Sequence, residues 1–286
     1  MMQFDMDLGS VMELKLSKQY LTELPNLSMY PNLKVLNCKR NILTKLDNLP
    51  RMLEILDCKH NNITHLDNLP STLTILECSS NKLTKLDNLP QYLESLNCSD
   101  NNITQLDNLP STLKILRCSY NVLKNLENLP FGLEYLYCEH NDIEELDNLP
   151  SNLIELHCNN NQLTQLDNLQ PNLKILNCES NKITRLDNLP AGIENLNCKD
   201  NCIILLNNLP SNLEYLTCEK NDISKLDNLP HSLKFLYCQF NQLTKLDNLP
   251  PRLSKLYCYY NHFIYEFAPT LENIRNYNSS IVRPDL

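Results

Sequence analysis

The chain carries a column of cysteines at a constant spacing of 20 residues, which runs without a break from Cys38 to Cys258. An asparagine follows each of these cysteines by three residues, from Asn41 to Asn261. A fixed period of this length, kept along most of the chain, indicates one structural unit that is stacked many times. We therefore expect a repeat architecture, in which function depends on the variable surface residues and not on the repeated frame.

The shared frame of the repeats reads L-x-x-L-x-C-x-x-N-x-[LI]-T-x-L-D-N-L-P-x-x. Twelve units start at 20-residue steps from Leu33 to Leu253, and a degenerate unit of 22 residues starts at Val11. The alternating inward residues of L-x-x-L-x-C have the period of two that is typical of a strand. The remaining half of each unit is short and contains proline, so it is expected to be extended, polyproline-like or a short turn.

The first half of the frame resembles the leucine-rich repeat signature. The L-D-N-L-P half resembles the short LPX-type repeats of secreted bacterial effectors, some of which carry a ubiquitin-ligase domain. It is also similar to the leucine-rich repeat proteins of amoeba-infecting giant viruses of the mimivirus type. The resemblance covers about residues 11–265. It implies a solenoid with a curved stack of short parallel strands on its concave face and little helix.

The repeat boundaries predict three segments of one elongated domain. Residues 1–32 are expected to form an N-terminal cap with the degenerate first repeat, and residues 33–264 form the twelve 20-residue repeats. Residues 265–286 are expected to form a C-terminal cap, in which a short helix over residues 270–276 covers the open end of the core.

The cysteine and asparagine columns are interpreted as structural. Each cysteine holds the third inward strand position and is expected to be a buried free thiol, because cysteine packs as a small hydrophobe. Disulfides between neighbouring strands under oxidising conditions, or a soft metal ion, are the alternatives. Each asparagine is expected to be buried and to hydrogen-bond the backbone of its own and the neighbouring unit.

An acidic column follows in each repeat, at Asp47, Asp67, Asp87 and onward. We expect an Asx turn, in which the carboxylate accepts the backbone N–H two residues later. A cation-binding rail is the alternative. Lysines two positions earlier, such as Lys45 and Lys85, would dilute the repulsion between neighbouring carboxylates.

Composition and motifs restrict the function classes. The net charge is -9, whereas nucleic-acid binding proteins carry a basic surface, so no nucleic acid is expected as partner. No apolar stretch is long enough for a membrane span, and the N-terminus lacks the features of a signal peptide, so a cytoplasmic location is expected, in the host cytoplasm if the protein is viral. The three glycines form no phosphate-binding loop, and no hydrolase motif occurs. We therefore expect no enzyme activity, catalytic residue, metal or cofactor.

The two outward strand positions and the residues beside them vary between repeats, and aromatic residues accumulate there near the C-terminus. The expected partner-binding residues are Tyr215, Phe235, Tyr237, Phe240, Tyr257, Tyr259 and Tyr260. Secondary candidates on the same face are Ile55, Ile75, Ile115, Tyr135, Tyr137 and Ile175. Exposed aromatic side chains on one face are typical of contact surfaces, although β-branched and aromatic residues also favour strands for packing alone.

Charged residues on this face are unevenly distributed. A basic corner near the N-terminus contains Lys34, Lys39, Arg40, Lys59 and His60, and acidic residues such as Glu179 and Glu219 lie further along the chain. Such a gradient either steers a charged partner or forms an ordinary solvated face.

The sequence predicts a non-catalytic scaffold that binds a protein partner in its concave face. The oligomeric state is left open, and a monomer is favoured. The resemblance to the giant-virus proteins implies that the scaffold is a viral protein that acts on host proteins. One alternative is an adaptor that brings substrates to a separate enzyme such as a ubiquitin ligase. Another alternative is a self-associating structural protein of a virus particle.

Overall fold

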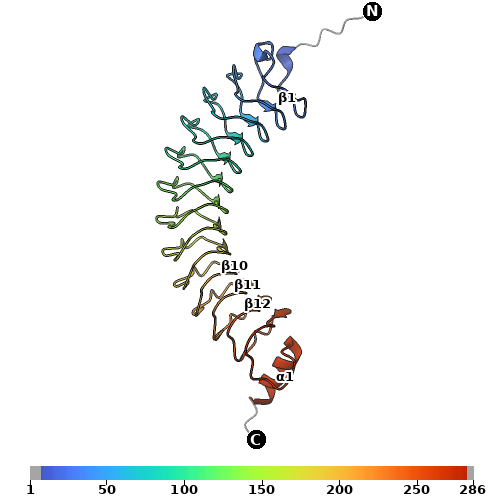
Figure 1. Ribbon diagram of the computed structural model, residues 1–286, viewed down its shortest axis with the longest axis vertical. Coiled ribbons are helices and arrows are strands. Elements are labelled where there is room, and N and C mark those ends of the chain that lie inside the picture. The colour runs from blue at the N-terminus through green and yellow to red at the C-terminus, as the bar shows by residue number, and fades with distance from the viewer. Residues whose placement is uncertain (1–7, 282–286) are drawn as a thin grey trace, which may run out of the picture. The chain divides into compact units, whose positions relative to one another are not determined.

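The computed structural model describes residues 8–281 of the 286-residue chain. These residues form two compact units: the first ends at Asp142 and the second begins at Ile143. Both units are built in the same way, from three-residue strands joined by long non-helical segments (Figure 1).

The strands of each unit are parallel and follow one another in chain order. The first unit contains β1 (Glu13–Lys15), β2 (Val35–Asn37), β3 (Ile55–Asp57), β4 (Ile75–Glu77), β5 (Ser95–Asn97), β6 (Ile115–Arg117) and β7 (Tyr135–Tyr137). The second contains β8 (Glu155–His157), β9 (Ile175–Asn177), β10 (Asn195–Asn197), β11 (Tyr215–Thr217), β12 (Phe235–Tyr237) and β13 (Lys255–Tyr257). The structure confirms the predicted solenoid of short parallel strands with little helix.

The register of the strands equals the repeat period, so that equivalent residues lie side by side. Leu36 of β2 pairs with Leu56 of β3, and Ile55 pairs with Ile75 of β4. The middle residue of a strand points into the core, and the first and third residues point to the opposite side, because side chains alternate along a strand. We call the side that displays these first and third residues the strand face.

The core is a column of leucine, isoleucine and cysteine side chains. In the repeat that starts at Leu73, the residues Leu73, Leu76, Cys78 and Leu83 are all 0 % exposed. All twelve column cysteines are buried free thiols, as the sequence predicts. One repeat cannot enclose these side chains by itself, so its stability depends on the repeats next to it.

The column asparagines connect neighbouring repeats through main-chain groups. The amide nitrogen of Asn81 donates to the carbonyls of Cys58 (3.1 Å), Cys78 (3.0 Å) and Ser79 (3.2 Å), and its oxygen accepts the N–H of Ile63 at 3.0 Å. Two of these partners belong to the preceding repeat and two to its own. The predicted ladder of buried asparagines is thus confirmed.

Each full repeat contains two residues with a left-handed backbone, and no described residue with positive φ is a glycine. The first directly precedes the ladder asparagine, as Ser80 does with a φ of 54°. The second is the asparagine of L-D-N-L-P, such as Asn48 with a φ of 55°. Asparagine tolerates this conformation better than most residues, which explains its presence at the second position.

The predicted Asx turn at the acidic column is wrong. In the described residues, none of these carboxylates accepts the N–H two residues later. Several contact the side chain two residues earlier instead: Asp47 pairs with Lys45 at 2.5 Å, and Asp107 accepts a hydrogen bond from Gln105 at 2.7 Å. The left-handed asparagine turns the chain without help from the carboxylate, which is therefore left to bind its side-chain neighbour.

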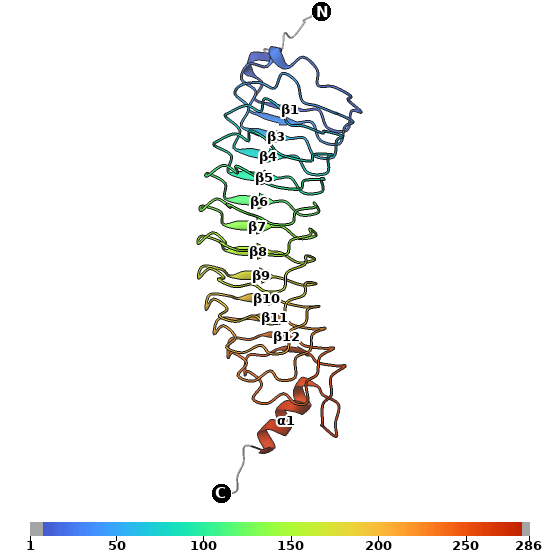
Figure 2. The same cartoon turned by 60° about the vertical axis from the view of Figure 1, so that its left-hand side comes forward.

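Short helical elements lie near the two ends of the described chain. A 3-10 turn, η1 (Leu8–Ser10), precedes β1, and a second, η2 (Leu27–Met29), precedes β2. The single α-helix of the described residues, α1 (Leu271–Ile281), follows the last repeat (Figure 2). It extends beyond the expected end at residue 276. Its Ile274 is fully buried, and Arg275 donates to the carbonyls of Pro250 and Leu253.

Among residues 8–281, no helix has the length and apolar character that crossing a membrane requires.

Candidate protein interface

The predicted aromatic residues of the second unit occupy four positions of the repeat, two in the strand and two shortly after it. Tyr215 and Phe235 begin β11 and β12, and Tyr237 and Tyr257 end β12 and β13. Phe240 and Tyr260 lie beyond the strands, next to the ladder asparagines. The strand register places residues of adjacent repeats opposite each other, and this determines which aromatic rings meet.

The rings form three stacks rather than one mixed cluster. Ring centroids are 4.6 Å apart for Tyr215 and Phe235, 5.0 Å for Tyr237 and Tyr257, and 4.6 Å for Phe240 and Tyr260. Tyr259 meets the rings of Phe240 and Tyr260 edge-on, at interplanar angles of 80° and 79°. We call these seven residues the aromatic patch.

The two rings of each stack cover one face of each other, which leaves ring edges and outer faces for other contacts, such as that of Lys255 with the ring of Phe235. Phe235 and Tyr237 are half-buried, and the other five members of the patch are exposed, Tyr260 most of all at 71 %. Ring edges carry partial positive charge, so they favour contact with the faces of other rings and with hydrogen-bond acceptors. The patch therefore has the chemistry of a protein contact surface.

Phe240 and Tyr260 hold their rings on left-handed backbone, with φ of 55° at both residues. This conformation costs a residue with a side chain roughly 1–2 kcal/mol. The same position holds Ser80 and Asn160 in other repeats, so the frame does not require an aromatic residue there. Strand propensity does not explain these two rings, because neither residue lies in a strand.

The secondary candidates lie on the strand faces of both units and are all half-buried. Ile55 and Ile75 are paired across adjacent strands, and Ile115 pairs with Tyr135. Arg117 lies over the ring of Tyr137, 4.8 Å from its centroid. Ile175 lies apart from these, in register with Asn195 of the second unit.

One further aromatic contact was not predicted from the sequence. Tyr120 stacks on His140 with ring centroids 4.2 Å apart, and Tyr120 is 55 % exposed. Both residues occupy the left-handed position before the ladder asparagine, where Phe240 and Tyr260 also lie. The sequence does contain the signal for this contact, namely bulky residues at the position directly before the ladder asparagine.

Charges on the strand face are largely neutralised by ion pairs. Of the basic corner, Lys34 pairs with Glu54 at 2.7 Å, and Lys39 lies 3.5 Å from Asp57. In the second unit Lys199 pairs with Glu219 at 2.6 Å, and this hydrogen bond raises the pKa of the lysine. The acidic and basic groups therefore compensate one another locally, which weakens the predicted gradient.

The thiol column offers no reactive or metal-binding site in the described chain. Burial raises the pKa of Cys38 and of Cys98 to about 12, and it raises the pKa of Cys178 and Cys218 as well. A thiol that stays protonated is a poor nucleophile and a poor metal ligand. Residues 8–281 contain no group of three or more His, Cys, Asp or Glu side chains placed to hold a metal ion.

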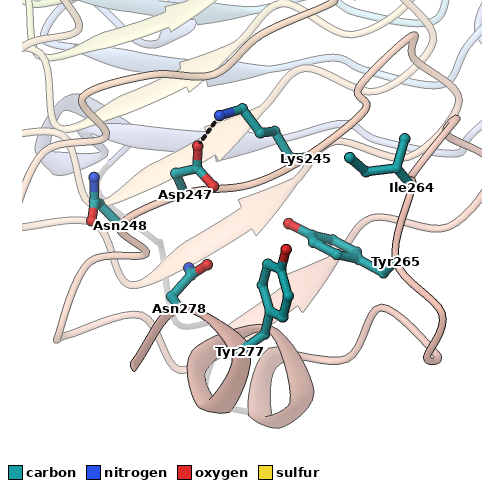
Figure 3. A pocket seen from close by; sticks show the side chains of 7 residues that line it. All are labelled: Lys245, Asp247, Asn248, Ile264, Tyr265, Tyr277 and Asn278. Carbon is teal, nitrogen blue, oxygen red and sulfur yellow. Dashed lines mark ion pairs between the residues drawn. The ribbon is translucent and has the colours of Figure 1, made fainter. Parts of the chain in front are cut away.

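A cavity of about 480 Å³ lies between α1 and the last repeats (Figure 3). Its polar groups are occupied in holding the cap: the Tyr265 hydroxyl accepts the N–H of Leu246 at 2.7 Å, and Asn278 donates to the carbonyl of Leu246. The rings of Tyr265 and Tyr277 meet edge to face, with centroids 5.3 Å apart. These contacts explain the residues of the cavity as parts of the C-terminal cap.

No protein-family model matches the chain, and no curated protein does. Solved structures do match it. The leucine-rich effector protein YopM from Yersinia pestis is 33 % identical with a TM-score of 0.78, and the match covers 88 % of this chain and 78 % of that one. For YopM from Yersinia enterocolitica WA-314 the identity is 29 %, the TM-score 0.62 and the coverage 88 % and 74 %.

The functional domain of InlJ from Listeria monocytogenes, which includes a cysteine ladder, is 30 % identical with a TM-score of 0.78. That match covers 90 % of this chain and 65 % of the other. The frame, the strand stacking and the extent of the match to YopM from Yersinia pestis lead to one conclusion: the chain belongs to the leucine-rich repeat family.

Proposed function

We propose that this protein is a non-catalytic scaffold that binds a protein partner through the aromatic patch on the strand face of its second unit. The observation that carries the proposal is the pair Phe240 and Tyr260. Two bulky rings are held on left-handed backbone and remain exposed, although the repeat frame tolerates small or polar residues there. The left-handed backbone is common to this position in the other repeats, so the particular feature is the pair of large exposed rings, and exposed aromatic side chains gathered at one place are typical of a contact surface.

The neighbouring rings add to this support. The stacks of Tyr215 with Phe235 and of Tyr237 with Tyr257 extend the same surface along three repeats. Aromatic residues contribute much of the binding energy at the centres of protein interfaces. Their edges favour a partner that supplies aromatic faces and backbone carbonyls, rather than one that supplies only cations.

The test removes the two rings without harming the fold. The double variant F240G/Y260G relieves the left-handed strain, so its thermal midpoint should stay equal to the wild type or rise. If the patch binds the partner, the partner recovered by affinity purification with wild type should bind this variant about 1–4 kcal/mol more weakly. Binding is measured by titration calorimetry with the identified partner.

Matched controls use the same backbone position in other repeats. Ser80→Gly and Asn160→Gly change an equivalent left-handed residue outside the patch and should leave the affinity unchanged. Loss of stability in F240G/Y260G would show that the rings serve packing. Unchanged affinity in that variant and in Y237A/Y257A would exclude the patch as the binding site.

A further inference from the structure

The repeat at residues 193–212 differs from both neighbouring repeats at four nearby positions, of which two, at Ile204 and Asn207, are also departures from the common frame. It carries Cys202, Ile204, Leu205 and Asn207 along the segment between the ladder asparagine and the L-D-N-L-P turn. The preceding eight and the following two repeats carry only polar residues where Ile204 and Leu205 stand, such as Thr84 and Lys85. Asn207 takes the place of an acidic residue. We call these four residues the flank patch.

The flank patch is open to solvent. Ile204 is 57 % exposed and Leu205 is 47 % exposed, and Cys202 is the one exposed thiol in the described chain. Ten other repeats fold with polar residues at these two places, so the frame does not need the apolar side chains for its own packing. Neighbouring exposed apolar residues of this kind mark contact surfaces.

The last repeat shows what accompanies apolar residues at these places. There the equivalent residues are Ile264, Tyr265 and Phe267; α1 contacts the two rings, whereas Ile264 is itself 72 % exposed. Tyr277 of α1 lies 5.3 Å from the ring of Tyr265 and 5.4 Å from that of Phe267. No described segment contacts the flank patch in the way that α1 contacts the rings of the last repeat.

Charges around the flank patch are balanced and arranged in two columns. The basic column contains Arg185 and Lys225 on either side of Leu205, and the acidic column contains Asp187 and Asp227 on either side of Asn207. The columns are adjacent, since Arg185 lies 3.4 Å from Asp187 within one repeat. A surface of this kind is complementary to itself: if two copies face each other across a two-fold axis parallel to the strand stack, each basic column faces an acidic column.

We propose that the flank patch is a self-association surface, through which two copies of this chain form a weak side-by-side dimer. Ile204 and Leu205 of each copy are buried in the contact. Asn207 lies against these aliphatic side chains, and its side chain carries no charge that would have to be desolvated. Arg185 and Lys225 of one copy face Asp187 and Asp227 of the other. The interface is isologous, as expected for a closed homodimer. This proposal replaces the sequence-based expectation of a monomer and is independent of the aromatic patch.

The test is sedimentation velocity of the full chain over a wide concentration range. Wild type should shift with concentration from its monomer mass of 33.2 kDa towards twice that mass. The double variant I204T/L205K restores the residues of other repeats and should weaken the dimer at least about 100-fold, because the contact loses four aliphatic side chains, two from each copy. Asn207→Asp should weaken it about tenfold, because a carboxylate would be desolvated against Leu205.

Both variants are expected to fold, because each introduces residues that the frame carries elsewhere, and thermal unfolding checks this. The matched control Y237A/Y257A changes the strand face and should dimerise like wild type. A wild type that remains monomeric at its highest soluble concentration would overturn the proposal. The proposal would also be overturned if I204T/L205K folds and associates as strongly as wild type. The same holds if Y237A/Y257A abolishes the dimer and I204T/L205K does not.

Discussion

Removal of one ladder asparagine tests how the repeats are coupled. In Asn81→Ala, the N–H of Ile63 loses its acceptor, and the carbonyls of Cys58, Cys78 and Ser79 each lose one donor. Each carbonyl keeps a second donor: Cys58 also accepts from Asn61, Cys78 from Asn101, and Ser79 from the N–H of His60. One orphaned buried N–H costs about 1–3 kcal/mol, and the lost hydrogen bonds to the carbonyls add about 1 kcal/mol, so we expect a total near 2–4 kcal/mol.

The shared carbonyls make a sharper prediction for pairs of variants. In the double variant N81A/N101A, the carbonyl of Cys78 loses both donors and is orphaned, so the effects of the single variants should add with an excess of about 1–3 kcal/mol. N81A/N121A provides the control. Asn121 donates to the carbonyls of Cys98 and Cys118, which Asn81 does not touch, so these two effects should simply add.

The assay is urea unfolding of the single and double variants, with Lys82→Ala as the control for an exposed neighbour. Lys82→Ala should cost less than about 0.5 kcal/mol. Equal costs for Asn81→Ala and Lys82→Ala would refute the ladder as a source of stability. An N81A/N101A cycle without excess would refute the sharing of carbonyls between neighbouring asparagines.

Three further predictions concern the thiols and the left-handed turns. A thiol reagent should label Cys202 in the native protein and the twelve column cysteines only after unfolding; rapid native labelling of most thiols would contradict their burial. Burial raises the pKa of column thiols such as Cys98 from 9.0 to about 12, so the protonated form is favoured in the folded state. The stability contribution of the Cys98 thiol should be complete below pH 9 and fall between pH 9 and 12, by about 1.4 kcal/mol per pH unit, and Cys98→Val should reduce the slope of unfolding free energy against pH by that amount. At the second left-handed position, Asn88→Ala should cost about 1 kcal/mol and Asn88→Gly less than 0.5 kcal/mol in urea unfolding, and equal costs would speak against backbone conformation as the reason for asparagine there.

The sequence predicted the strand positions, their register and the core, because the pattern that determines them recurs in every repeat. The columns of Leu36, Cys38 and Asn41 and their equivalents fix which residues point inward, and a period of 20 leaves one register for the strands. The two left-handed residues of each repeat were not predicted, because glycine is the usual signal and this chain uses residues such as Ser80 and Asn48 instead. The proximity of Lys45 to Asp47 was expected, whereas the expected Asx turn was wrong because the left-handed asparagine closes the turn without the carboxylate.

The aromatic patch could be predicted as a set of residues on one face but not as an arrangement of rings. Strand register alone pairs Tyr237 with Tyr257, whereas the edge-on approach of Tyr259 depends on side-chain rotamers that no pattern encodes. The flank patch was visible in the sequence as a difference from the neighbouring repeats at Ile204 and Leu205. Its significance required the exposure of these side chains, which only the folded chain provides.

The single buried thiol of each full repeat makes local opening measurable along the whole array. A thiol becomes reactive only when its repeat separates from a neighbour, so the labelling rate at each column cysteine reports the free energy of that event. Brief exposure to a reagent, followed by mass spectrometry of the peptides, would give one opening free energy per repeat without any added probe. Repeats next to an end should open most easily. Cys258 is 3 % exposed, and burial raises its pKa to about 11 whereas it raises that of Cys98 to about 12, so Cys258 should be labelled before Cys98.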